Sequence, residues 1–160
     1  MKKVLVMLLI GIMTVMPSCG QKIKKENVTP LRPDCNVSTD YNGIKYFAKI
    51  CYSETGVMTV EMSEPLKGMV FQIDDSGCQI GFDGMKLNYT TEQVKSFCPF
   101  IKLYFVLKTV CYTVPDSVRV DGEEYVLKYH TPEISCTAKS SRNSGTLNKI
   151  ESEDIEFTFS

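Results

Sequence analysis

The stretch that decides the fold is residues 69–89, which read MVFQIDDSGCQIGFDGMKLNY. Apolar side chains alternate with polar ones along it in three short runs. The alternating apolar positions are Met69, Phe71 and Ile73, then Cys78, Ile80 and Phe82, and then Met85, Leu87 and Tyr89. Asp75-Ser76-Gly77 and Asp83-Gly84 separate the runs and supply the positive φ that tight hairpins need. The stretch therefore predicts a meander of antiparallel strands, each with one buried face and one wetter face.

Strand patterns continue on both sides of this meander. Upstream, residues 44–52 form one further strand pattern, and Met58, Val60 and Met62 share the face of another. Downstream of Pro115 the strand patterns return over residues 118–120, 125–129, 134–138, 147–150 and 155–159, with turns at Asp121-Gly122 and Ser144-Gly145. The sequence therefore predicts an α+β domain that is mainly antiparallel β.

A segment in the middle of the chain interrupts the strands. Thr90 and Gln93 match a capping box, which predicts a short helix over residues 91–97. Pro99 suits the first position of a second helix, whose body over residues 100–110 is apolar on nearly every side. A helix of that kind must be covered all round. A strand is the alternative, because the segment is also rich in aromatic and β-branched residues, and we favour the helix.

Composition limits the classes of function. The chain has 160 residues, with 18 Lys and Arg against 19 Asp and Glu, one His and seven Cys. A net charge of −1 provides no basic field, so we expect no nucleic-acid partner. A charged fraction of 23% and ordinary numbers of Gly and Pro exclude a collagen-like or wholly disordered chain, and the length suits one domain with a hydrophobic core and a tail.

The N-terminus has the composition of a signal peptide. Lys2 and Lys3 form a basic start, and residues 4–16 are almost wholly apolar. This apolar run is too short to span a bilayer comfortably but matches the core of a secretion signal. The alternative, a buried N-terminal helix, is disfavoured by the lysine pair and by the polar segment that follows. We therefore expect an exported protein.

The tetrapeptide Met16-Pro17-Ser18-Cys19 resembles the lipobox of bacterial lipoproteins. The resemblance implies cleavage after Ser18 and attachment of diacylglycerol to the thiol of Cys19, which would make the lipid bilayer a partner of the chain. One acyl chain holds a protein only marginally and two hold it stably, so the two chains of diacylglycerol give a stable anchor, to which acylation of the new amine would add a further chain. In an alternative reading, Ser18 and Gly20 are the small residues of an ordinary cleavage site, which releases a soluble protein.

The polar segment that follows separates the anchor from the folded part. Residues 19–40 contain two prolines and few apolar residues, and they show no period of 2 or 3.6. Such a segment predicts a flexible tether. The predicted organisation is a signal peptide over residues 1–18, lipidated Cys19 with its tether over residues 19–40, and a β-rich domain over residues 41–160. The domain would lie on the extracytoplasmic face of the cell membrane.

Five short segments occur in a fixed order along the predicted domain. They are Phe47-Ala48-Lys49-Ile50, Glu64-Pro65-Leu66-Lys67-Gly68-Met69, Gly84-Met85-Lys86-Leu87, Gly145-Thr146-Leu147-Asn148-Lys149-Ile150 and residues 155–159. This order resembles a group of small clostridial-type lipoproteins whose fold is related to the LolA and LolB lipoprotein carriers. The resemblance implies a curved, incompletely closed barrel covered by one or two helices. The concave side of the carriers takes acyl chains, which implies a hydrophobic or amphiphilic ligand here.

The sequence offers little catalytic chemistry. His130 is the single histidine, and its alternation with Tyr129 places it on the wetter face of a strand. No nucleophile elbow, phosphate-binding loop or zinc motif is present. We therefore expect no enzyme activity, no catalytic residue and no cofactor.

An acidic cluster near the C-terminus is the one grouping with the chemistry of a metal site. It consists of Glu151, Glu153, Asp154 and Glu156. At strand and turn spacing we expect a solvated face, with a loose divalent-cation site as the alternative. No metal ligand is assigned.

Six cysteines remain beyond Cys19, and none is in C-x-x-C spacing. Cys78 and Cys136 lie in the apolar phase of their strands, where a free thiol acts as a small hydrophobe. Disulfides are the alternative in an exported domain. Cys35, within the predicted tether, is expected to be the exposed free thiol.

Three hypotheses about function follow. The first is a surface lipoprotein whose half-barrel binds an apolar or amphiphilic ligand, or a partner, without catalysis. The second is a structural or protein-interaction module with a filled core. The third is a thiol-active exported protein, which we rank last because no two cysteines are close in sequence. A cavity between helix and sheet, lined by Met, Phe and Leu, would favour the first hypothesis over the second.

Overall fold

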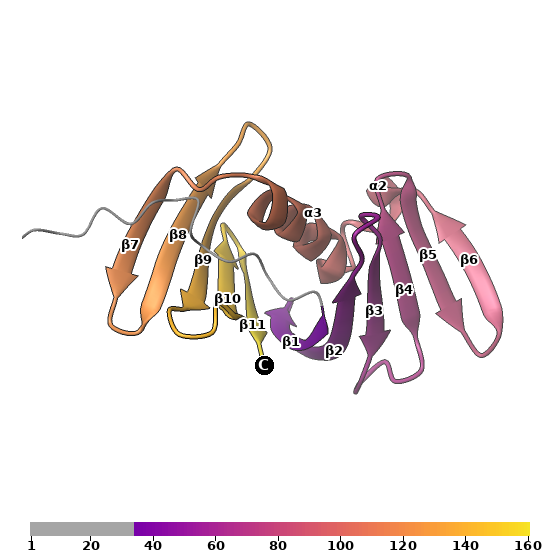
Figure 1. Cartoon of the computed structure of the whole chain (residues 1–160). Helices are drawn as coiled ribbons and strands as arrows, with labels where there is room; N and C mark the ends of the chain where they lie inside the picture. The colour runs from indigo at the N-terminus through magenta and orange to yellow at the C-terminus, as the bar shows by residue number, and fades with distance from the viewer. Residues whose placement is uncertain (1–33) are drawn as a thin grey trace, which may run out of the picture.

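The computed structural model describes residues 34–160, which form one long sheet and two helices. Figure 1 shows how these elements are arranged. The first strands are β1 (Asp34–Tyr41), β2 (Ile44–Tyr52), β3 (Met58–Met62), β4 (Val70–Asp74), β5 (Gly77–Phe82) and β6 (Met85–Tyr89). Helices α2 (Thr91–Val94) and α3 (Pro99–Tyr112) come next. The chain ends with β7 (Ser117–Asp121), β8 (Glu124–His130), β9 (Ser135–Ser141), β10 (Leu147–Ser152) and β11 (Ile155–Phe159).

All eleven strands belong to a single antiparallel sheet in the order β6-β5-β4-β3-β2-β1-β11-β10-β9-β8-β7. The first and last strands of the described chain therefore lie side by side at its centre, with Val37 opposite Phe159. Within residues 34–160, strands β6 and β7 are the two free edges, so the sheet is not closed. Figure 1 shows it curving around α3. The prediction of a mainly antiparallel, incompletely closed sheet with helices on one side is confirmed.

Both predicted helices are present, and the strand alternative for the second is wrong. At the start of α2 the backbone N–H of Thr90 donates to Oε1 of Gln93 over 2.9 Å, as a capping box requires. Pro99 occupies the first turn of α3, where its missing N–H costs no hydrogen bond. The buried residues of α3 are Pro99, Phe100, Ile101, Leu103, Tyr104, Val106 and Leu107. A strand would present these residues on two faces, whereas a helix in a curved sheet buries them together.

The concave face of the sheet and α3 form one hydrophobic core. Residues in register across neighbouring strands line the concave face: Ile50 faces Val60, and Val60 faces Phe71. The ring of Phe71 lies 6.4 Å from that of Phe100 on α3. Residues of β8 to β11, including Leu127 and Phe157, belong to the same cluster of buried side chains. Both halves of the sheet therefore use α3 as part of their core.

A polar contact fixes the position of α3 against one half of the sheet. Asp75, in the turn between β4 and β5, accepts a hydrogen bond from the Tyr104 hydroxyl at 2.9 Å. Nζ of Lys108, one helical turn further on, lies 2.6 and 2.7 Å from the two carboxylate oxygens. The hydrogen bonds from Lys108 and Tyr104 hold the pKa of Asp75 below its ordinary value. The contact thus joins α3 to the β4–β5 turn.

The predicted boundary between tether and domain is wrong. Residues 34–40, assigned to the tether, belong to β1, which pairs with β2 along its whole length and with β11. Val37 and Thr39 are buried, and the hydroxyl of Thr39 donates to the carbonyl oxygen of Glu156 over 2.7 Å. The sequence did not predict this strand, because its inward side carries one aliphatic residue and its outward side is wholly polar. The signal peptide, Ser18, Cys19 and the tether up to residue 33 lie outside the described residues.

Leu103 tests the role of α3 in stability. It is fully buried in the helix, so Leu103→Ala is expected to lower the free energy of unfolding by about 2–5 kcal/mol, through lost burial and a residual cavity. Phe97→Ala is the matched control, because Phe97 lies just before the helix and is exposed, and should change it by less than about 0.5 kcal/mol. Urea denaturation measures both. Equal losses in the two variants would contradict the packing described.

Candidate functional site

A pocket of about 520 Å³ opens beside α3, and we call it the lateral pocket. Its walls come from α2, from α3, from the loop before β9 and from the turn between β10 and β11. The lining residues are Thr91, Glu92, Lys95, Ile101, Lys102, Phe105, Val106, Glu133, Ile134, Ser135, Ser152 and Glu153. The pocket therefore lies where β9 begins and β10 ends, and elements far apart in sequence meet there.

The lateral pocket has an apolar floor. Ile101 and Phe105 are four residues apart on α3, so helical geometry puts both on the same face. Val106 adds a buried side chain, and Ile134 closes the floor from the loop before β9. Phe105 and Ile134 are only half-buried, which leaves their apolar surface within reach of a ligand.

The rim of the lateral pocket carries charges of both signs. Lys95 forms an ion pair with Glu92, and Lys102 forms one with Asp154 in the β10–β11 turn. The hydrogen bond from Lys102 holds the pKa of Asp154 below its ordinary value, so the carboxylate stays ionised at neutral pH. Glu133 and Glu153 complete the rim, and neither is paired with a lysine among the residues that the structure describes. The rim thus holds two lysines against four carboxylates, which gives it a net charge of −2.

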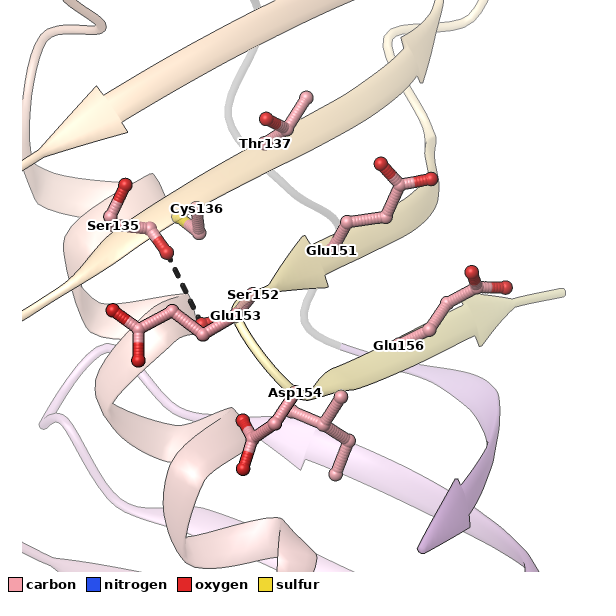
Figure 2. A pocket seen from close by; sticks show the side chains of 9 residues that line it. Ser135, Cys136, Thr137, Glu151, Ser152, Glu153, Asp154 and Glu156 are labelled. Carbon is pink, nitrogen blue, oxygen red and sulfur yellow. Dashed lines mark hydrogen bonds between the residues drawn. The ribbon is translucent and has the colours of Figure 1, made fainter.

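A second hollow, of about 510 Å³, adjoins the first and shares Ser135, Ser152 and Glu153 with it. Figure 2 shows the carboxylates of the predicted acidic cluster arranged around the turn between β10 and β11. The hydroxyl of Ser152 donates to the carbonyl oxygen of Ser135 over 3.2 Å, which ties this turn to the start of β9. The structure thus brings the whole acidic cluster together on one surface.

Lysines neutralise part of this acidic cluster. Nζ of Lys149 lies 2.8 Å from Glu151 and 2.7 Å from Glu156, and Lys139 approaches Glu151 at 3.5 Å. The hydrogen bond from Lys149 lowers the pKa of Glu151, and those to Glu151 and Glu156 raise the pKa of Lys149. Within residues 34–160, no group of three or more His, Cys, Asp or Glu side chains has the arrangement of a metal site. The solvated face expected here is therefore a set of exposed ion pairs.

The six cysteines of the described chain are free thiols, and most are shielded. Burial raises the pKa of Cys78 to about 12, and those of Cys98, Cys111 and Cys136 to about 11. Such thiols are protonated at neutral pH and are poor nucleophiles. These four positions give no support to the thiol-active hypothesis.

Among the cysteines of residues 34–160, the exposed thiol is Cys51 and not Cys35, contrary to the prediction. Cys35 faces inward from β1 and is half-buried, and burial raises its pKa to about 11. Cys51 lies between Ile50 and Tyr52, whose side chains are buried, so alternation turns it to the convex face of β2. The same alternation in the sequence could have identified it.

His130 lies at the exposed end of β8, and Tyr129 beside it is buried, as predicted. The backbone N–H of His130 donates to a carboxylate oxygen of Asp116 over 2.6 Å, which fastens the end of β8 to the segment before β7. This contact uses the main chain, and the side chain of His130 is exposed. His130 is not among the residues that line either pocket.

Helix α3 occupies the middle of the concave face, where the first hypothesis expects a Met-, Phe- and Leu-lined cavity. Leu103 and Leu107 are fully buried there against the sheet. The space that remains for a ligand lies to the side of the helix, in the lateral pocket. The lateral pocket could not be predicted from the sequence, because the pocket depends on how four separate elements meet. The sequence did identify the neighbouring acidic cluster.

No protein-family model and no curated protein matches this sequence. In the part of the chain that the structure describes, neither helix has the length and hydropathy that a bilayer crossing demands.

Proposed function

We propose that the protein is an exported lipoprotein whose β domain binds an amphiphilic ligand in the lateral pocket without catalysis. In this proposal Cys19 carries the diacylglycerol anchor, Ser18 precedes the cleavage site, and the domain lies on the extracytoplasmic face of the cell membrane. The observation that carries the binding part is the apolar floor of the lateral pocket beneath a charged rim.

The size and lining of the lateral pocket support a small amphiphile. A volume of about 520 Å³ lies within the usual range for small-molecule pockets. Phe105 and Ile134 offer half-buried apolar surface to an acyl chain or ring. The rim has two lysines among a majority of carboxylates, so it suits a zwitterionic or polar headgroup better than a strongly anionic one.

The open, curved sheet around α3 supports a relation to the LolA and LolB carriers, which we propose on the segments quoted from the sequence. In that group the concave side of a half-barrel receives acyl chains. Here α3 fills the middle of the concave side, so the proposal places the ligand beside the helix.

A structural or protein-interaction module is the second candidate function. It is favoured by the buried residues of α3, which fill the core between the two halves of the sheet. In that case the lateral pocket would hold only water, and the outer surface of the domain would carry the function.

Phe105 tests the binding proposal. Phe105→Ala should weaken the binding of a fluorescent fatty acid or lysophospholipid about tenfold, a loss of about 1.4 kcal/mol, because it removes apolar floor. Phe47→Ala is the matched control, because that ring is 49% exposed on the convex face, and should leave binding unchanged. Fluorescence titration measures both. Failure of the unaltered protein to bind either probe would leave the interaction module as the better account.

The anchor is tested by the intact mass of the protein purified from the membranes of a bacterial host. We expect a chain that begins at Cys19 and carries the added mass of diacylglycerol, since the thioether is formed on that thiol. Cys19→Ala should lose the lipid mass, whereas Cys51→Ser should keep it. A lipid-free chain that begins at Gln21 would instead establish the released form.

A further inference from the structure

Strand β6 combines a free sheet edge with an exposed apolar face. Met85 is 65% exposed and Leu87 is 57% exposed, and Phe82, opposite Met85 on β5, is 48% exposed. Leu87 is in register with Ile80, and Ile80 with Phe71, whose ring packs on α3. The three exposed side chains therefore lie on the concave side, beyond the reach of the helix. We call Phe82, Met85 and Leu87 the edge patch.

The two edges of the sheet are protected to different degrees. Strand β7 carries an ion pair, in which a guanidinium nitrogen of Arg119 lies 3.1 Å from Asp121. Strand β6 has a single charged residue, Lys86, on the face opposite to the edge patch. Natural proteins guard free edges with charges, prolines or bulges, and a bare apolar edge pairs with another strand. The edge at β6 is therefore the better docking surface.

We propose that two copies of this chain pair through β6, antiparallel and about a two-fold axis at Leu87. In that register Leu87 faces Leu87 of the second copy, Met85 faces Tyr89, and Lys86 faces Asn88. Directly opposed residues in an antiparallel pair have Cβ atoms about 4.5–5.5 Å apart, so Leu87 would pack on Leu87 and Met85 on Tyr89 across the new strand pair. The pairing would join the two eleven-stranded sheets into one.

The sequence of β6 is complementary to itself in this register, which favours a second copy of this chain as the partner of the strand. Apolar residues meet apolar residues on the concave side, and no charge meets a like charge. Moving the axis one residue toward Met85 places Lys86 opposite Lys86, which is unfavourable, and moving it one residue toward Tyr89 replaces the central apolar pair by two asparagines. The two-fold arrangement uses the same edge of both copies and stops at a dimer, whereas pairing β6 with β7 of another copy is head-to-tail and can continue into a filament.

The experiment is oxidative cross-linking of the full chain in cells, read on non-reducing gels, with Cys51→Ser as the parent. Leu87→Cys should give a disulfide-linked dimer, because the axis brings the two Leu87 positions within the Cα separation that a disulfide requires. Met85→Cys is the matched control on the same strand and face, and is more exposed in the monomer. Its two copies would lie four residues apart along the strands, about 13 Å, and should not cross-link.

A third variant, Val120→Cys, examines the opposite edge at β7. The account predicts a dimer with Leu87→Cys at least about tenfold more abundant than with Met85→Cys or Val120→Cys, since the disulfide geometry is met only at the axis. No dimer above the parent with Leu87→Cys would overturn the proposal. Equal dimer with Met85→Cys would indicate random collision, and dimer with Val120→Cys would indicate a different edge; either result also overturns it.

Discussion

The structure depends on one constraint: the broad apolar surface of α3 must be covered by the rest of the chain, and residues 99–107 carry nearly all of that surface. Helix α3 buries Phe100, Leu103 and Leu107 along one length of chain, and a flat sheet could cover only part of that surface. Eleven strands that curve around the helix cover it from both halves (Figure 1). The open, curved sheet and the filled concave face are thus two consequences of the same apolar segment.

The two halves of the sheet meet where β1 pairs with β11, which places strands from opposite ends of the described chain in the centre. This junction lies under α3, so the helix and the central pair stabilise one another through the shared core. The Asp75 contact with Tyr104 and Lys108 then fixes the position of the helix on one side. On the other side a gap remains between α3 and the β10–β11 turn, and that gap is the lateral pocket.

Much of this fold could be predicted from the sequence because its signals are local. The alternation over residues 69–89 identified the meander, and Thr90, Gln93 and Pro99 identified where the helices begin. Strand β1 was missed because its burial is supplied by neighbours: Thr39 is covered once β2 and β11 pair on either side of it. The lateral pocket was missed for the same kind of reason, since Phe105 and Ile134 come together only through tertiary packing.

Native-state hydrogen exchange of the α3 amides tests most directly whether the helix and the curved sheet form one cooperative unit. Because the core is shared, the amides of α3 should exchange with the same opening free energy as those at the β1–β11 junction, and with the same dependence on low denaturant concentration. Exchange of α3 at a clearly lower free energy, while the central strands stay protected, would show that the sheet holds its shape without the helix and would contradict the account.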